Sequence, residues 1–357
     1  MKLIVQIPAF NESADIAEVL THIPRSIPGI DTVEVLIIDD GSSDNTVAVA
    51  MAHGADYVVR HTGNKGLAAA FQTGIDTALR LGADIIVNTD ADHQYPGSEI
   101  PRLVAPIVEG RAEYVIGDRQ VQTIEHFSPF KKALQHIGSS VVRWASGTEV
   151  PDTVSGFRAL SREAALRMFV TTDFSYTVEN LIQAGKKRLT IATVPIRTNP
   201  EKRPSRLHRG NWNFIKRQAA TIARTYATYE PLKTFSYMAA AFFMLAGLAW
   251  GRAFYVFLGR RFGWFGDQTL SNDQALLIGG ILLVLGVITF LIGLLADRIG
   301  GARRVQDEIL YRLRKQEIET EAWRRSVIAR LDQVETALEL GADAGAGNVY
   351  RQDTKTP

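Results

Sequence analysis

Along about the first 200 residues, short apolar runs alternate with longer segments whose apolar positions follow a helical period. The short runs are rich in Ile, Val and Leu and predict buried strands, and several of the intervening segments end in glycine, as helices commonly do. This alternation predicts an α/β domain whose mainly parallel sheet is covered on both faces. The predicted strands are residues 3–7, 33–38, 57–59, 85–87, 114–116 and 189–194, and the predicted helices are residues 13–22, 45–53, 67–81, 98–108, 131–144, 161–168 and 178–184.

The pattern changes after residue 234. Residues 235–258 are apolar except for Arg252, and residues 275–296 carry no charge. Each stretch is long enough to cross the hydrocarbon core of a bilayer as a helix. Basic residues precede the first stretch and follow the second, which predicts a multi-pass protein of the cytoplasmic (inner) membrane with both long ends in the cytoplasm. These residues are Lys216, Arg217, Arg224 and Lys233 before, and Arg298, Arg303 and Arg304 after.

An aromatic and basic segment, residues 206–234, connects the predicted N-terminal domain, residues 1–205, to the first apolar stretch. Such a mixture predicts helices that lie at the headgroup level of a cytoplasmic leaflet. The alternative is an ordinary amphipathic helix packed on the domain. The residues concerned include Trp212, Phe214, Ile215, Ile222, Tyr226 and Tyr229.

Beyond the second apolar stretch, residues 303–340 are charged and predict a cytoplasmic helix. Apolar residues in it alternate at spacings of four and three, which favours a short coiled coil and a homo-oligomer. Residues 341–357 are Gly, Ala and polar and predict a disordered tail. The apolar seam consists of Val327, Leu331, Val334 and Leu338.

Composition narrows the classes of function. The 357 residues include 40 Lys and Arg against 38 Asp and Glu, so the formal net charge of +2 gives no overall basic field for nucleic acid. The chain has no cysteine, which excludes disulfides and thiolate metal sites. The apolar run at the N-terminus is stopped by Pro8 and is too short for a signal peptide.

Two acids follow the predicted strand 85–87. Asp90 and Asp92 stand one residue apart, where both carboxylates can point into one cleft. In an open α/β sheet, ligands bind beyond the carboxyl ends of the strands. Mg²⁺ or Mn²⁺ takes carboxylate oxygens and completes its shell with substrate phosphates, which fits Asp90, Asp92 and the amide oxygen of Gln94. A capped turn is the alternative, and His93 is expected to be solvated.

Polar motifs also follow the first two strands and open the third helix. Backbone groups of residues 8–12 could frame a flat base, and Glu12 could hydrogen-bond the base or ribose, with helix capping by Asn11 or Ser13 as the alternative. Asp40 could accept from a base or ribose, and Gly41 allows a close backbone approach. Residues 63–66 place backbone amides and a lysine where an anion such as a diphosphate is favoured. They match neither the dinucleotide nor the P-loop glycine pattern, and a plain turn is the alternative.

Together, residues 8–12, 39–44, 64–66 and 90–92 resemble, in order and spacing, the nucleotide-sugar half of family 2 glycosyltransferases, which have the GT-A fold. The resemblance covers about the first 200 residues. It implies a nucleotide-sugar site and a divalent metal at Asp90, Asp92 and Gln94. The implied donor-binding residues are Pro8, Ala9, Asn11, Glu12, Asp40, Gly41, Ser42, Lys65, Gly66, Asp90 and Ala91.

Further segments resemble the polyprenyl-phosphate branch of that family, which includes dolichyl-phosphate mannose synthase. They include residues 117–119, ending in Arg119, residues 152–158, beginning with Asp152, and residues 205–207, which look like a Ser-Lys-Leu segment with Arg206 in place of Lys. Some relatives carry an acid before the Phe-Arg pair, where this chain has Gly156, so Asp152 is the nearest acid that could act as a base. The resemblance implies a catalytic set of Asp90, Asp92, Asp152 and Arg119, and an acceptor-phosphate set of Arg119, Ser155 and Arg206.

A phosphate acceptor removes the need for a strong base, because a phosphomonoester with a second pKa near 6 is largely dianionic at neutral pH. We therefore expect a membrane-bound inverting glycosyltransferase that moves one hexose from a UDP- or GDP-sugar to a polyprenyl phosphate on the cytoplasmic face. One alternative is a processive polysaccharide synthase, whose Gln-x-x-Arg-Trp motif residues 140–144 resemble except that Ser140 replaces Gln. The other is a membrane scaffold whose sugar site has decayed.

Overall fold

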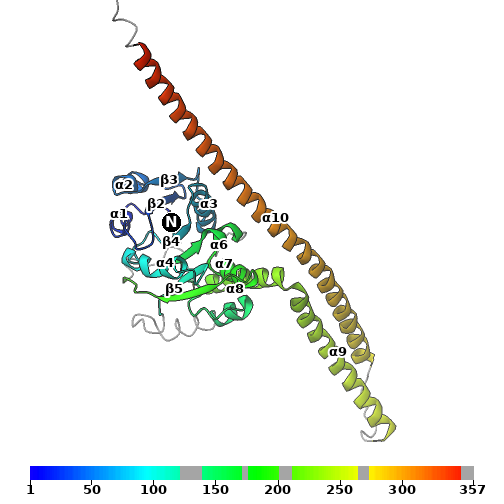
Figure 1. The fold of residues 1–357 in the computed structure, drawn as a ribbon. Helices are drawn as coiled ribbons and strands as arrows, with labels where there is room; N and C mark the ends of the chain where they lie inside the picture. The colour runs from blue at the N-terminus through cyan, green and yellow to red at the C-terminus, as the bar shows by residue number, and fades with distance from the viewer. Residues whose placement is uncertain (121–138, 171–175, 201–210, 264–272, 347–357) are drawn as a thin grey trace, which may run out of the picture.

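The computed structural model describes residues 1–120, 139–170, 176–200, 211–263 and 273–346 (Figure 1). Within these residues, seven strands form one sheet. The strands are β1 (Lys2–Ala9), β2 (Thr32–Asp39), β3 (Tyr57–Arg60), β4 (Ile85–Asn88), β5 (Tyr114–Asp118), β6 (Arg158–Ser161) and β7 (Ile191–Pro195). Their order is β3-β2-β1-β4-β6-β5-β7, and every neighbouring pair without β6 is parallel. The predicted mainly parallel sheet is confirmed.

Strand β6 is the exception, and the sequence did not predict it. It pairs antiparallel with both β4 and β5. Its first residues therefore lie at the same edge of the sheet as the last residues of the parallel strands. This reversal brings the segment before β6, including Asp152 and Gly156, to the edge where the predicted site residues lie.

Helices cover both faces of the sheet. Successive residues of β1 point to opposite faces, so Leu3 packs in one core cluster and Ile4 in the other. Burying one such side chain contributes roughly 1.5–3 kcal/mol. The Leu3 face carries α1 (Ile16–Thr21), α2 (Thr46–Ala52) and, after the short η1 (Gly97–Glu99), α4 (Ile100–Val108); the Ile4 face carries α3 (Leu67–Arg80), α6 (Arg162–Arg167) and α7 (Tyr176–Lys186). Of the predicted helix at 131–144, only residues from 139 onward are described, and these are helical to residue 146.

The strand order reverses direction between β1 and β4. From β1 the chain moves outward to β2 and β3, and then returns to place β4 on the other side of β1. In an open α/β sheet, the crevice in which ligands bind lies beyond the carboxyl ends of the strands at such a reversal. Here the loops that follow β1 and β4 both lead to helices of the Leu3 face, α1 and α4. Asn11 and Glu12 follow β1, and Asp90 and Asp92 follow β4, so the topology supports the predicted position of the site.

Two long helices follow the N-terminal domain: α9 (Pro231–Arg261) and α10 (Asp273–Ala346) (Figure 1). Both are long and apolar enough to cross a membrane. Small residues recur every seventh position along their contact, which lets the helix backbones approach closely. On α9 these are the buried Ala239, Ala246 and Ala253; on α10, Gly279, Gly286, Gly293 and Gly300 lie against Trp250, Phe243, Phe235 and Pro231 of α9.

Helix α10 is continuous where the sequence predicted two separate segments, 275–296 and 303–340. Gly300 and Gly301 lie inside it, although each glycine costs about 1 kcal/mol in a helix. Packing on α9 and on the N-terminal domain outweighs that cost. The helix continues to Ala346, so the tail predicted to be disordered from residue 341 begins inside it, and residues 347–357 lie outside the described residues. The predicted coiled coil stays a prediction.

Helix α8 (Asn211–Tyr229) links the domain to α9. Ile222, Tyr226 and Tyr229 pack against the core cluster on the Ile4 face of the sheet. The ring of Tyr226 lies 4.6 Å from the ring of Trp144. These three α8 side chains thus face the domain, as the amphipathic-helix alternative expected, rather than lipid.

Candidate functional site

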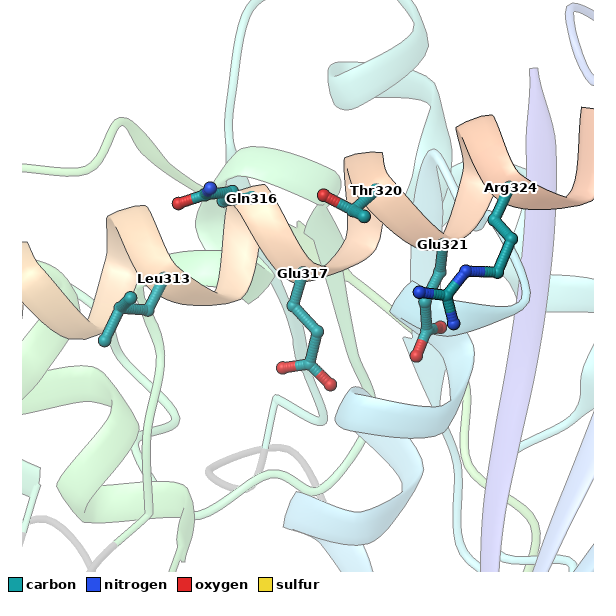
Figure 2. Close-up of a pocket in the computed structure, with 6 residues that line it drawn as sticks. All are labelled: Leu313, Gln316, Glu317, Thr320, Glu321 and Arg324. Carbon is teal, nitrogen blue, oxygen red and sulfur yellow. The ribbon is translucent and has the colours of Figure 1, made fainter. Parts of the chain in front are cut away.

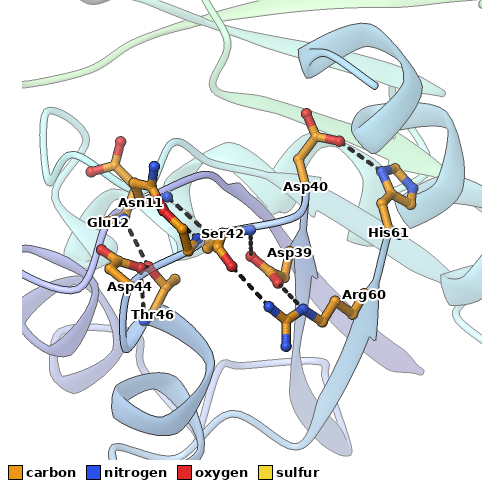
Figure 3. A network of polar contacts seen from close by, with 10 residues as sticks. Asn11, Glu12, Asp39, Asp40, Ser42, Asp44, Thr46, Arg60 and His61 are labelled. Carbon is orange, nitrogen blue, oxygen red and sulfur yellow. Dashed lines mark hydrogen bonds and ion pairs between the residues drawn. The ribbon is translucent and has the colours of Figure 1, made fainter. Parts of the chain in front are cut away.

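The carboxyl ends of the parallel strands bring the predicted residues to one edge of the sheet. The loop after β1 supplies Asn11 and Glu12, the loop after β2 supplies Asp40 and Ser42, and β4 leads to Asp90. Figure 3 shows the first two loops beside each other, with His61 and Arg60 on the neighbouring β3 segment. The common edge follows from the parallel sheet, as the sequence predicted.

The loops after β1 and β2 are joined by their own hydrogen bonds. Asn11 adopts a positive φ of 55°, and its backbone N–H donates to Ser42 Oγ at 2.9 Å. In return, the backbone N–H of Ser43 donates to Asn11 Oδ1 at 2.9 Å. The Glu12 N–H donates to Thr46 Oγ1 at 2.8 Å (Figure 3). These bonds fix the two loops before any ligand arrives, which lowers the entropy cost of binding.

Asp39 and Asp40 are both held by donors from the protein. Asp39 is fully buried, pairs with Arg60 Nε at 3.0 Å and accepts from the Ser42 N–H at 3.0 Å. Asp40 accepts from the backbone N–H groups of Lys65 and Gly66 at 2.8 Å each. Its Oδ1 also lies 2.8 Å from His61 Nδ1 (Figure 3). Asp40 thus fixes the loop that opens α3, and its predicted contact with a base or ribose stays a prediction.

Gly41 permits the close approach of two loops. Its φ is +78°, and a Cβ at this position would lie 2.7 Å from the carbonyl carbon of Gly63. A side chain would therefore push apart the β2 loop and the loop before α3. That second loop presents the exposed Lys65 beside the first amides of α3, where an anion is favoured.

Asp90 is half-buried just beyond the end of β4, two residues before Asp92. Burial and the negative charge of Asp92 raise the pKa of Asp90 to about 7, although the positive charge of Arg119 opposes this shift. Asp92 is exposed, and its Oδ1 accepts from the backbone N–H of Gln94 at 3.0 Å. The two acids thus repel each other without full compensation by the protein, which a divalent cation would supply.

The donor set fits a divalent cation whose shell is completed by substrate. Among the described residues, no group of three or more His, Cys, Asp and Glu side chains is arranged to hold a metal. Asp90, Asp92 and Gln94 offer oxygens, and the oxygens of a bound diphosphate would supply the rest.

Asp90 is surrounded by a buried polar network that was not predicted from the sequence. Asn88 accepts from Gln6 Nε2 at 2.9 Å and donates to the Gly156 carbonyl at 2.8 Å and to Tyr176 Oη at 3.0 Å. The Gly156 N–H donates to Tyr95 Oη at 3.3 Å. Burial raises the pKa of Tyr95 to about 12, which keeps the phenol protonated. The only sequence signal was the position of Asn88 at a strand end and of Tyr95 just after the acids.

Arg119 and Asp152 form a two-point ion pair. Arg119 Nε donates to Asp152 Oδ2 at 2.7 Å and Nη2 donates to Oδ1 at 3.0 Å. Only 2% of Asp152 is exposed. Both of its oxygens are therefore engaged, which argues against the predicted role of Asp152 as a free base. Burial alone would lower the pKa of Arg119, but Tyr95 and Asp152 outweigh it and raise that pKa.

The remaining predicted acceptor residues are Ser155 and Arg206, of which the structure describes only Ser155. Ser155 is fully buried, so a phosphate could reach it only after movement of the chain. Arg206 lies outside the described residues. Arg158 is also fully buried, and its guanidinium donates to the carbonyls of Thr153 and Ser155 at 3.0 and 2.7 Å. It holds the segment before β6 in place.

The prediction that His93 is solvated is wrong. Only 8% of it is exposed, so it is not solvated. Its Nε2 lies 3.5 Å from Glu18 and its ring lies 4.9 Å from that of His22. These partners belong to the α1 side of the crevice, and His93 therefore braces α1.

Comparison with known proteins matches residues 4–169 to the family description "Glycosyl transferase family 2". A UDP-N-acetylglucosamine–dolichyl-phosphate N-acetylglucosaminyltransferase of Methanococcus voltae is 31% identical over 54% of this chain and 83% of the relative. A polyprenol monophosphomannose synthase of Mycolicibacterium smegmatis is 27% identical over 55% of this chain and 76% of the relative.

Among solved structures, glucosyl-3-phosphoglycerate synthase of Mycobacterium tuberculosis, with Mn²⁺, uridine diphosphate and phosphoglyceric acid, superposes with a TM-score of 0.50. The match covers 63% of this chain and 77% of that one at 22% identity, and it supports the fold alone. Residues 4–169 include the crevice and all of its acids.

Proposed function

Because this chain belongs to glycosyltransferase family 2, we propose that it transfers one hexose, with inversion, from a nucleotide sugar to a polyprenyl phosphate at the cytoplasmic face of a membrane. Two relatives named for transfer to dolichyl phosphate or polyprenol support the acceptor class. They are named for different sugars, N-acetylglucosamine and mannose, so the hexose stays open. The two apolar helices α9 and α10 support a bilayer location.

The donor lies across the joined loops after β1 and β2. Asn11, Glu12 and Ser42 line the crevice where a nucleoside would be held, and the hydrogen bonds between the loops keep that surface in shape. The diphosphate extends toward the side chain of Lys65 and the N-terminus of α3, where an anion is favoured. The backbone N–H groups of Lys65 and Gly66 themselves donate to Asp40, which holds this loop in place.

Asp90, Asp92 and Gln94, together with the diphosphate, would hold a divalent cation, Mg²⁺ or Mn²⁺. When bound, the cation would supply a Lewis acid for the negative charge on the departing nucleoside diphosphate. The position of Asp90 and Asp92 just beyond β4, at the same edge of the sheet as the donor loops, carries this assignment. Burial and the charge of Asp92 raise the pKa of Asp90 although Arg119 opposes this, which favours a further cation there.

The acceptor needs no base from the protein. A prenyl phosphate is largely dianionic at neutral pH and can attack the sugar directly. Arg119 orients the acceptor phosphate. Asp152 accepts hydrogen bonds from two of its nitrogens, Nε and Nη2, and so sets the direction of the guanidinium. This arrangement accounts for Gly156, which has no side chain to act as a base.

The test is transfer of label from a panel of UDP- and GDP-sugars into the lipid phase by the purified full-length protein in vesicles that contain polyprenyl phosphate. We expect one donor to give a lipid-linked monosaccharide, and expect none without the divalent cation. A lipid-linked polymer would favour the processive synthase, and failure to bind any nucleotide sugar would favour the scaffold.

A further inference from the structure

Helix α10 runs without interruption from its apolar stretch, which the proposed function places in the bilayer, to the N-terminal domain. We call its residues 297–318 the strut. From Ala296 to Arg314 the strut advances about 27 Å at the usual helical rise. The glycine and alanine contacts with α9 brace its base, since Gly293 and Gly300 lie against Phe235 and Pro231. The strut is therefore a direct and stiff connection between the membrane and the domain.

The strut docks on the domain through Arg314. Its Nη1 donates to the carbonyls of Leu166 and Met168, at the end of α6, at 3.1 and 2.8 Å. Its Nη2 forms an ion pair with Asp76 of α3. Arg314 is only 12% exposed, and one turn later Ile318 is buried in the core cluster of the Ile4 face. One side chain thus joins the strut to two helices of the domain.

Weaker contacts flank this joint on both sides. Lys187 lies 3.7 Å from Asp307, and Arg80 lies 2.8 Å from Glu317. Figure 2 shows the same stretch of α10, where residues from Leu313 to Arg324 line a shallow depression. All of the lining residues belong to α10, so the depression contains no group of the carboxylate site.

From Asp76, polar contacts continue along α3 to the donor site. Asp76 also accepts from Gln72 Nε2 at 3.0 Å. The adjacent Thr73 lies 3.0 Å from His61 Nε2, and the other nitrogen of His61 lies 2.8 Å from Asp40. Asp40 in turn holds the loop that opens α3. Helix α3 is therefore fixed to the strut at one point and to the donor loop at another.

We propose that Arg314 and Asp76 are positioning residues that hold the carboxylate site at one height above the bilayer, where a lipid-borne phosphate is presented. This inference rests on the proposed acceptor. It goes further because it assigns control of the distance between the carboxylate site and the membrane to the strut rather than to the domain itself. An acceptor that is free in water does not depend on that height.

The test compares two acceptors with the full-length protein in vesicles. For Arg314→Gln and Asp76→Asn we expect kcat/KM for a bilayer-embedded polyprenyl phosphate to fall about tenfold or more, and that for a short water-soluble prenyl phosphate to change by less than about twofold. Arg312→Gln is the matched control, because Arg312 is 76% exposed and, within the part of the chain that the structure describes, forms its ion pair with Glu308 of the same helix. Equal loss with both acceptors, or loss with neither, would overturn the proposal.

A second measurement does not depend on activity. The chain has no cysteine, so spin labels can be placed at the exposed Met51 and Ile299, on the domain and on the strut. The distance distribution between them should be narrow in the parent protein and in Arg312→Gln, and broad in Arg314→Gln. If the parent protein transfers sugar to neither acceptor, the proposed function fails, but the distance distribution still tests the role of the strut. A distribution that is not broader in Arg314→Gln than in the parent protein would reject that role.

Discussion

The carboxylate of Asp90 lies against Gly156 so closely that a Cβ on Gly156 would be 3.0 Å from both Asp90 oxygens. Gly156 is also bonded through its carbonyl to Asn88 and through its N–H to Tyr95. Its backbone therefore cannot move away without breaking the buried network. Asp90 can therefore occupy its observed position only because residue 156 has no side chain.

Gly156→Ala should displace Asp90. We expect kcat to fall by about tenfold or more, because small errors in the position of a reacting group are costly. Steady-state transfer assays and a thermal melt measure activity and folding separately. Gly247→Ala is the control, since a Cβ there meets nothing within 4 Å. Full activity of Gly156→Ala would contradict the assigned role of Asp90.

Asp152→Asn separates an orienting acid from a base. We expect a higher KM for the acceptor and a modest change in kcat, because the substitution loosens Arg119, whereas loss of a general base costs about 10²–10⁴ in rate. The fall in rate on the acidic side, near the acceptor's second pKa of about 6, should persist. A pH–rate profile of the variant measures both. If the variant loses both this acidic limb of the profile and most of kcat, Asp152 acts as the base.

Asp92→Asn should remove metal-dependent turnover. Asp92 is exposed, so the fold should be unchanged, while activity should fall about a hundredfold or more because the counter-charge for the leaving diphosphate is lost. Mn²⁺ binding followed by electron paramagnetic resonance, alongside activity, tests this. Asp31→Asn removes an exposed acid far from the crevice and should leave both unchanged.

Asp40→Asn should weaken the donor loop. An amide oxygen can replace only part of the bonding to Lys65, Gly66 and His61, and losing such charged hydrogen bonds costs about 1–3 kcal/mol of unfolding free energy. We expect a raised KM for the nucleotide sugar with little change in acceptor KM. Asp84→Asn, an exposed acid that accepts from one backbone N–H, at Lys2, should change neither KM. An unchanged donor KM for Asp40→Asn would remove Asp40 from this role.

Gly286→Leu should separate α9 from α10. A Cβ at Gly286 would lie 2.5 Å from the ring of Phe243, so overpacking should cost about 1–3 kcal/mol. Gly280→Leu is the matched control, because a Cβ there meets nothing within 4 Å. A thermal melt in lipid nanodiscs should show a lower midpoint for the first variant alone, and equal midpoints would contradict the seven-residue packing.

The fold was largely predictable because alternating strands and helices leave a strong pattern. Strand β6 was missed because it has four residues and begins with Arg158, and a charged residue argues against burial. The structure satisfies that charge with the carbonyls of Thr153, Ser155 and Thr177. The continuity of α10 was missed because the glycines at 300 and 301 are poor helix formers, and contacts with α9 and the N-terminal domain, which the local sequence does not show, decide the outcome.

The acids of the site were predictable from their places at strand ends, but their pairings were not. Arg119 and Asp152 are 33 residues apart, and Asp40 and His61 are 21 apart. No local pattern links such pairs. They meet because β6 runs opposite to its neighbours and because β2 and β3 lie side by side.

The most direct test of the account is formation of a lipid-linked sugar by the purified protein in vesicles that contain polyprenyl phosphate, with and without thorough chelation of divalent metal. The account predicts transfer from one nucleotide sugar that chelation abolishes and that Mg²⁺ or Mn²⁺ restores. Transfer that proceeds equally well under chelation, or no transfer from any donor, would contradict it.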